Sequence, residues 1–309
     1  RCPYRVGNRL SLFVAPRIGG PYEPIRCEIT RVFQPFFRAC EMAVCLVPPS
    51  PRLPGPLTLK LFDRRFAYGF RQRYSLPYWT QDIEIQYREF LQSADRPDFD
   101  RTHDYFHVPS EATRQEWTVG QHETFFHRVM SNNFCVEDEA YKRLGNMQGR
   151  HVPIKWGVVT MELEPLGTPG LSNARCGGFL LQHIQGFPLE RLGDYIRPNL
   201  WEGICRDAYD IVHNLYTRGI INFECRPEYL RVRPDDDGAT PKVFMVDFST
   251  CSFRRSGMSD NEWRRRKADV NEEGAIGSVM ELLLQGGYQY RPSQMYLTLA
   301  AEFPLPNGI

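Results

Sequence analysis

The stretch that most constrains the fold of this 309-residue chain is a loop and an acidic strand end in its last third. The segment 219–232 predicts a loop that closes on a short strand, because Pro227 excludes a helix through it. The segment 243–249 predicts a buried apolar strand with Asp247 at its end. Turn-forming residues fill 233–239 between the two segments. We therefore predict a loop that leads into a β-hairpin, with acidic side chains at both ends.

The composition limits the classes of protein to consider. Hydrophobic residues make up 42% and charged residues 24% of the chain, as in a soluble globular protein with a sizeable core. A net charge of +1 gives no reason to expect nucleic acid or an anionic membrane as partner. No apolar run approaches the ~20 residues that a membrane helix needs, and no signal peptide is visible.

The nine cysteines are spread along the chain without a Cys-x-x-Cys pair. This pattern favours buried free thiols over zinc ligands or disulfides. We therefore expect reduced cysteines and an intracellular protein, cytoplasmic or nuclear.

Two further segments carry charged residues in apolar surroundings. Lys60 lies in the alternating strand pattern of 57–66, where it is either an exposed edge residue or a charge kept for a ligand. The segment 136–144 predicts a helix with Glu137 on its apolar face. Glu139 points about 200° away around the helix and is expected to face solvent.

Taken together, these motifs resemble the protein kinase-like superfamily, most closely the fungal kinase-like proteins. Enzymes of that type carry a loop of the form His-Gly-Asp-x-x-Pro-x-Asn, followed by a hairpin and a metal-binding Asp-Phe-Gly. Arg226, Pro227 and Glu228 fit the loop pattern, and Asp247 fits the metal-binding Asp. The strings at 59–67 and 273–280 also resemble fungal members, and the resemblance covers roughly residues 28–290. The departures are Asn222 for His, Phe223 for Gly, Glu224 for the catalytic Asp and Tyr229 for the metal-binding Asn.

The resemblance implies an α+β, two-lobed protein kinase-like fold. We expect a β-sheet small lobe at 28–185, after an irregular N-terminal arm at 1–27. A mainly helical, abbreviated large lobe is expected at 186–309. Within the small lobe we expect strands at 29–36, 40–47, 57–66, 154–163 and 177–184, and an insertion at about 67–133 with helices near 80–93 and 111–131.

In the large lobe the apolar spacing of 200–216 predicts a helix that Gly219 ends. Residues 263–280 are expected to form the next helix. Its basic cluster, Arg264 to Lys267, predicts a solvated helix face.

The resemblance also implies roles for individual residues. Lys60 would contact nucleotide phosphates and pair with Glu137, and the hinge backbone at His183 and Ile184 would bind adenine. Asp247 would bind Mg²⁺, the cofactors being ATP and Mg²⁺. Glu224 and Arg226 would be the catalytic residues.

Several of the departures bear on catalysis. No glycine occurs between Gly20 and Gly55, so the hairpin turn 36–39 cannot bring backbone N–H groups as close to phosphate as glycines allow. Glu224 is one methylene longer than Asp, and Tyr229 is not the ligand that magnesium prefers. Three hypotheses stay open: a pseudokinase that binds nucleotide or a protein partner, an atypical ATP-dependent kinase using Glu224 and Asp247, and an interaction domain without nucleotide.

Four histidines in the insertion lack the spacing of a metal site and are expected on the surface or partly packed. They are His103, His107, His122 and His127.

Overall fold

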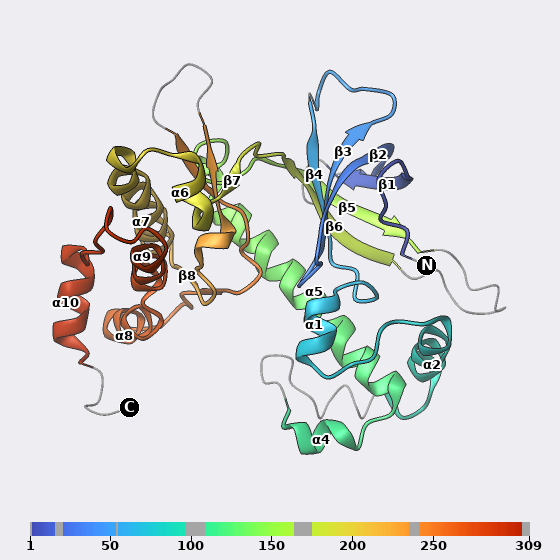
Figure 1. Cartoon of the computed structure of the whole chain (residues 1–309). Helices are drawn as coiled ribbons and strands as arrows, with labels where there is room; N and C mark the ends of the chain where they lie inside the picture. The colour runs from blue at the N-terminus through green and yellow to red at the C-terminus, as the bar shows by residue number, and fades with distance from the viewer. Residues whose placement is uncertain are drawn as a thin grey trace. The chain divides into compact units, whose positions relative to one another are not determined.

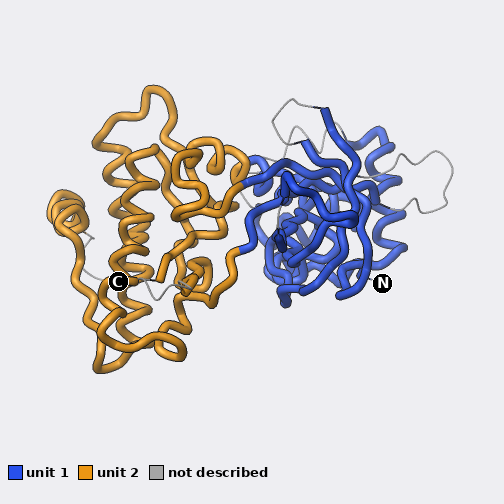
Figure 2. The backbone as a smooth tube through the Cα atoms, turned by 90° about the horizontal axis from the view of Figure 1, so that it is seen from above, with its two compact units in different colours: residues 1–135, 155–183 blue, residues 136–154, 184–309 orange. Residues whose placement is uncertain are grey.

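The computed structural model describes residues 2–15, 21–53, 55–96, 109–163, 175–234 and 241–304. The mixed α+β chain divides into two compact units, residues 1–135 with 155–183 and residues 136–154 with 184–309 (Figure 2). The long helix α5, Val119–Arg143, contributes its first part to unit 1 and its last part to unit 2. The lobe boundaries inferred from the sequence stay a prediction.

Six antiparallel strands of unit 1 form a closed barrel in the order β1-β2-β3-β4-β6-β5 (Figure 1). Its core is built from side chains that alternate inward along the strands, as the period of two requires. The strands predicted at 29–36, 40–47, 57–66, 154–163 and 177–184 are confirmed, with shifted ends. The bounds are β1 Arg9–Ala15, β2 Glu23–Phe33, β3 Cys40–Leu46, β4 Leu57–Leu61, β5 Lys155–Glu162 and β6 Arg175–Gln182.

The prediction of an irregular N-terminal arm at 1–27 was wrong, because β1 and the first part of β2 lie in this segment. Leu10, Leu12 and Val14 are buried in the barrel core and alternate with more exposed residues. Gly7, with φ +85°, makes the turn before β1. The high Gly and Pro content of this segment had favoured an irregular structure over the short alternating pattern of β1.

Among the described residues of unit 1 there are four α-helices, and Figure 1 shows α1, α2 and α4 grouped around the N-terminal part of α5. The helix predicted at 80–93 is confirmed as α2, which Thr80 caps by accepting from Ile83 N at 3.2 Å. The segment 111–131 holds α4 and the start of α5, and the helix predicted at 136–144 is the end of α5. The bounds are α1 Tyr68–Arg73, α2 Gln81–Gln92 and α4 Glu111–Gln115.

The turn between β2 and β3 is held against α1. The carbonyl oxygens of Phe36 and Phe37 accept hydrogen bonds from Gly69 N at 3.0 Å and Phe70 N at 3.1 Å. Phe36 is buried against Tyr4 and Tyr68. The turn is therefore packed into unit 1 by both its backbone and its aromatic side chains.

Unit 2 holds five helices and five short strands within the described residues. The predicted loop and hairpin are confirmed, because β9 and β10 pair antiparallel with Val232 opposite Val243. The helix predicted at 200–216 is confirmed as α7, and Gly219, with φ +67°, lies just beyond its end. The helices are α6 Leu192–Tyr195, α7 Trp201–Thr217, α8 Asp260–Val270, α9 Glu272–Leu283 and α10 Gln294–Glu302. The strands are β7 Phe187–Pro188, β8 Ile220–Asn222, β9 Leu230–Arg233, β10 Lys242–Met245 and β11 Cys251–Phe253.

The prediction of a single helix at 263–280 was wrong, because the helix is interrupted at Asn271. This residue adopts a left-handed conformation, with φ 44°, that an Asn tolerates better than most residues. Its side chain accepts from Gly274 N at 3.2 Å and so caps α9. The break gives two helices, α8 and α9, instead of one.

Candidate functional site

Asn222, the last residue of β8, is the centre of the loop in unit 2 that the sequence singled out. Its amide nitrogen Nδ2 donates to the backbone oxygen of Asp247 at 3.1 Å. Its Oδ1 accepts from Glu224 N at 3.1 Å and from Thr250 Oγ1 at 2.9 Å. One buried side chain thus joins the loop after β8 to the segment after β10.

Asp247 is fixed at the end of β10 with only 8% of its surface exposed. Its Oδ1 accepts a hydrogen bond from Ser249 N at 3.0 Å. The neighbouring Phe248 is fully buried and packs edge-on against Tyr141 of α5, with ring centroids 5.5 Å apart. The carboxylate is therefore held by a hydrogen bond within its own turn, and the next residue of that turn is anchored on α5.

A buried ion pair lies beneath the loop. Glu272, at the start of α9, accepts from Asn222 N at 2.8 Å through Oε1, and its Oε2 pairs with Lys267 Nζ. Both side chains are fully buried, and burial raises the pKa of the Glu272 carboxyl. Lys267 also donates to Val212 O at 3.4 Å. The loop backbone is thereby tied to α7, α8 and α9.

Lys267 was expected on a solvated helix face, and that prediction was wrong for this residue. Trp263 and Lys267 stand four residues apart on one face of α8, and both are buried. The spacing of four residues between Trp263 and Lys267 could have indicated that Lys267 lies on the buried face of α8. A buried Lys is expected only where it has a buried acidic partner, and the sequence did not identify Glu272 as that partner. Asn222, Thr250 and Glu272 were likewise not assigned structural roles from the sequence.

The residues predicted to be catalytic lie around this network with different degrees of exposure. Glu224 is half-buried and bonded to Asn222 through its backbone N–H. Arg226 is exposed and lies 3.6 Å from the Glu228 carboxylate. Tyr229 ends a short 3-10 helix, and its carbonyl accepts from Val246 N at 3.0 Å. The structure thus brings Glu224 and Asp247 into one hydrogen-bonded network, whereas Arg226 stays at its surface.

Two more predicted site residues belong to unit 2. Glu137 is completely buried on α5, one turn before the Tyr141 that contacts Phe248. Ile184 is buried just before Gly186. A Cβ on Gly186 would lie 2.2 Å from Val232 O, so close backbone approach is the reason for glycine at this position.

Lys60 and His183 belong to unit 1. Lys60, on β4, is 1% exposed and lies 3.4 Å from Glu41, its cross-strand neighbour on β3. His183 follows β6, with its Nδ1 3.0 Å from Thr58 Oγ1 and its ring stacked on Phe33. Lys60 is thus a buried charge and not an exposed edge residue. Its predicted pairing with Glu137 stays a prediction.

The donor groups fit a divalent cation only in part. Asp247 offers a carboxylate, which magnesium prefers, but Tyr229 offers a neutral phenol where an amide oxygen would serve. Within the described ranges no group of three or more His, Cys, Asp or Glu residues is placed to hold a metal ion. The residues of the loop therefore make no complete metal site of their own, although magnesium carried by a nucleotide needs only one or two carboxylates.

The histidines of the insertion do not converge on one another where they are described. His127 is largely buried beside Tyr87, and burial, together with the Arg64 charge, lowers its pKa to about 4. His122 packs against Trp117. His103 and His107 lie outside the described residues. Across the part of the chain that the structure describes, no helix is both long and apolar enough to cross a membrane.

The chain was compared with protein families, curated proteins and solved structures. No protein-family model and no curated protein matches the chain. Among solved structures, the chain is similar to Rad53 1-466 in complex with AMP-PNP, with 11% sequence identity and a TM-score of 0.42. The match covers 89% of this chain and 52% of that chain, so this chain spans about half its length. A TM-score this low does not establish a shared fold, and we draw no conclusion from it.

Proposed function

We propose that this chain is a pseudokinase, a kinase-like module that binds a nucleotide or a protein partner without efficient phosphoryl transfer. The observation that carries the proposal is the loop organised by Asn222. The Asn222 side chain joins the backbone of Glu224 to the backbone of Asp247 through hydrogen bonds. These are the positions that the sequence resemblance aligns with the catalytic Asp and the metal-binding Asp of kinases. The residues that the chemistry would need, Glu224 and Tyr229, are nevertheless altered.

The altered residues act on the most demanding parts of phosphoryl transfer. That reaction depends on positioning of the acceptor and on stabilisation of charge by metal ions. The extra methylene of Glu224 displaces a carboxylate by about 1 Å, and such a displacement can cost about a hundredfold in rate. The phenol of Tyr229 removes a preferred magnesium ligand.

The packing of the β2–β3 turn also disfavours nucleotide held through a backbone cradle. The turn contains no glycine and is bonded to α1 through Phe36 and Phe37. The backbone of this turn is hydrogen-bonded to α1 and does not form a glycine-rich phosphate loop. Any nucleotide affinity would then depend on side chains such as Lys60 and Asp247, which predicts weak, magnesium-dependent binding.

The runner-up is an atypical ATP-dependent kinase, and one observation favours it. Glu224 still carries a carboxylate, and its backbone shares Asn222 with Asp247. A base and one metal ligand would then lie on the same network. An interaction domain that binds no nucleotide is the third reading.

A thermal-shift series with ATP, with and without Mg²⁺ or Mn²⁺, and a phosphotransfer assay together separate the three readings. The pseudokinase proposal expects a metal-dependent shift with negligible turnover. Robust phosphotransfer that is lost in Glu224→Ala would establish the atypical kinase instead. Without any shift, only a protein partner is left as the ligand.

Restoring the family residues tests the cause of the low activity. Glu224→Asp with Tyr229→Asn should raise magnesium-dependent ATP binding, turnover or both. The matched control is Glu202→Asp with Tyr195→Asn, two exposed positions of unit 2, which should change neither. An unchanged restored variant that still folds would show that these two residues are not what limits the site.

A further inference from the structure

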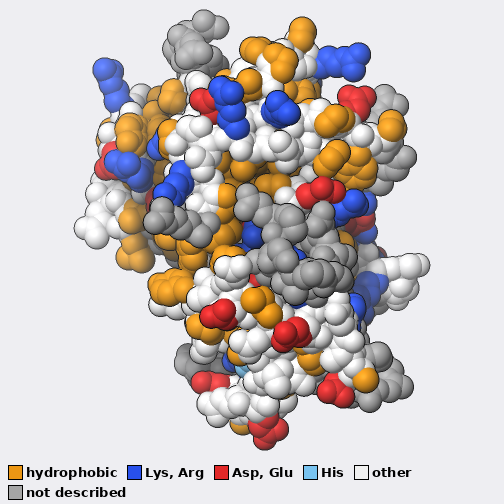
Figure 3. Space-filling view, turned by 90° about the vertical axis from the view of Figure 1, so that its right-hand side faces the viewer, with side chains coloured by type: hydrophobic (Ala, Val, Ile, Leu, Met, Phe, Trp, Pro, Cys, Tyr) orange, Lys and Arg blue, Asp and Glu red, His pale blue; other side chains and the backbone are white. Residues whose placement is uncertain are grey.

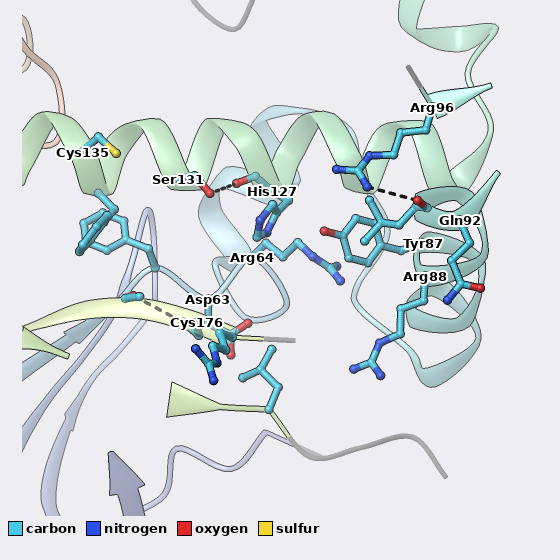
Figure 4. A pocket seen from close by; sticks show the side chains of 16 residues that line it. Asp63, Arg64, Tyr87, Arg88, Gln92, Arg96, His127, Ser131, Cys135 and Cys176 are labelled. Atoms are coloured by element: carbon cyan, nitrogen blue, oxygen red, sulfur yellow. Dashed lines mark hydrogen bonds between the residues drawn. The ribbon is translucent and has the colours of Figure 1, made fainter. Parts of the chain in front are cut away.

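Unit 1 contains a cavity of about 470 Å³, and all of its lining residues belong to unit 1 (Figure 4). Cavities that hold small molecules usually measure about 300–1,000 Å³. In Figure 4, α5 passes along one side with His127, Ser131 and Cys135, and α2 lies on another with Tyr87 and Arg88.

The cavity adjoins a buried cluster of ionised groups with unequal charge. Arg64 donates to Glu84 and Glu123, and Arg71 donates to Glu123 at 2.5 Å. Arg88 donates from Nε to Glu84 at 3.0 Å. All five side chains are at least 94% buried, and three guanidinium groups face two carboxylates. The cluster thus holds one positive charge in excess.

Arg88 is the member of the cluster whose charge is least compensated. It is 5% exposed and lines the cavity. Its Nε contacts Glu84, whereas its terminal nitrogens Nη1 and Nη2 have no hydrogen-bond partner among the described residues. The two terminal nitrogens of a guanidinium present parallel N–H groups that suit a carboxylate or a phosphate.

Asp63, the acidic residue of the cavity lining, already has partners of its own. Asp63 accepts from Arg65 and from Tyr4, whose hydroxyl lies at 2.6 Å. His127 does not add positive charge near neutral pH, because burial and Arg64 lower its pKa to about 4. Arg175 adds a further cation to the lining, although it also lies 3.4 Å from Glu162.

The remaining walls are mainly apolar and aromatic, with Gln92, Arg96 and Ser131 as further polar or charged members. They provide an apolar surface for the uncharged part of a ligand, next to the arginines that would bind its charged group. Small-molecule sites usually combine these two features. The apolar and aromatic lining residues are Phe62, Tyr87, Leu91, Phe134 and Leu163.

We propose that this cavity binds a small organic anion, with its carboxylate or phosphate group on Arg88 and its apolar body against Phe134 and Leu163. The ligand would supply the negative charge that the buried cluster lacks. This site is independent of the proposed pseudokinase function, because it uses none of the loop residues.

The test uses phenyl phosphate as the probe, with benzoate, inorganic phosphate and phenol for comparison. Cys135 gives a local readout, because it lines the cavity and is the one exposed cysteine of the nine. Alkylation of Cys135 by iodoacetamide is followed by peptide mass spectrometry. We expect saturable protection by phenyl phosphate or benzoate, and the stronger of the two identifies the preferred head group. Protection by phenol should be much weaker because it lacks the charge.

Two variants and two controls locate the ligand. Arg88→Met keeps the side-chain length and leaves two guanidinium groups with two carboxylates, so the fold should persist while affinity falls about tenfold or more. Ser131→Trp, at an exposed helical position, should block the cavity without changing any charge. Arg206→Met and Ser278→Trp, both exposed in unit 2, should bind as the unmodified protein does.

Each result bears directly on the proposal. Protection that Arg88→Met and Ser131→Trp both weaken, with the two controls unchanged, supports it. Absence of saturable protection by either aromatic anion overturns it, as does equal binding by all variants. Inorganic phosphate binding as tightly as phenyl phosphate would overturn the organic ligand, because the apolar walls would then contribute nothing.

Discussion

At the scale of single residues, the loop in unit 2 depends on one satisfied buried amide. Asn222 uses its Oδ1 twice and donates through Nδ2, while its backbone N–H is taken by Glu272. A buried polar group with all partners in place fixes one conformation, whereas the same group without partners would cost about 1–3 kcal/mol. The loop geometry is therefore built from Asn222 and Glu272, and not from the residues expected to do chemistry.

Removing one member of the buried Lys267–Glu272 ion pair should destabilise the protein more than neutralising both members. Lys267→Met leaves the Glu272 carboxylate buried without its cation, and we expect a loss of about 3–5 kcal/mol in the free energy of unfolding. Adding Glu272→Gln removes the unpaired charge and should recover most of that loss. Urea denaturation measures both, with Arg266→Met as a control that changes stability by less than about 1 kcal/mol. A double variant as unstable as the single one would contradict this account.

His127 should make stability depend on pH. Its pKa in the folded protein is about 4, against an ordinary value of 6.5, so the unfolded chain takes up the proton first as pH falls. The stability contributed by His127 is complete above pH 6.5 and is lost as pH falls toward 4. The lost amount reaches about 3 kcal/mol.

The variant His127→Phe should lack this part of the pH dependence. The free energy of unfolding, measured by urea between pH 7 and pH 4, should fall less steeply for His127→Phe than for the unmodified protein. His151→Gln, at an exposed position, should follow the unmodified protein. Parallel curves for His127→Phe and the unmodified protein would show that His127 is not buried as a neutral group.

At the scale of elements, two glycines with opposite surroundings give a matched test of packing. A Cβ on Gly186 would meet the backbone oxygen of Val232 at 2.2 Å, whereas a Cβ on Gly203, inside α7, meets nothing within 4 Å. Gly186→Ala should destabilise by about 1–3 kcal/mol. Gly203→Ala should stabilise by about 0.5–1 kcal/mol, because alanine is the better helix former. Thermal unfolding of the two variants in opposite directions is the expected result.

The elements predicted best were those whose periodicity is local. The hairpin around β9 and β10 followed from turn-forming residues and a short apolar run, and the amphipathic helix α7 followed from helical spacing. The strand β1 was missed because Gly and Pro around it outweighed its short alternation. The break at Asn271 and the burial of Lys267 depend on contacts between α8, α9 and the loop, which no window of sequence contains.

The candidate site was predictable as a list of residues more than as a geometry. Glu224 and Asp247 do share one network, but the side chain that joins them, Asn222, was known only as a departure from a pattern. The cavity of unit 1 could not be predicted, because it gathers residues from α2, α5, β6 and the segment after β4. Each of these residues is unremarkable in its own stretch of sequence.

At the scale of the whole molecule, charge is balanced and dispersed. The formal net charge is +1, and on the face shown in Figure 3 the Lys and Arg side chains of the described residues are scattered among acidic, apolar and other polar ones. Such a surface gives little long-range attraction for a strongly charged polymer. Recognition by this protein is therefore expected to depend on local sites, such as the buried arginine cluster, and not on a single-sign field.

The last prediction concerns the thiols of the whole chain. All nine cysteines are free in the structure, and six of them are buried. Burial raises the pKa of Cys27 and Cys205 to about 12, which lowers the fraction of reactive thiolate at neutral pH. In native protein, alkylation should therefore modify Cys135 first and the half-buried Cys2 and Cys45 more slowly. In denaturant without reductant, the intact mass should report nine modified thiols. A shortfall of two or more that reductant restores would reveal a disulfide and contradict both the structure and the expectation of reduced cysteines.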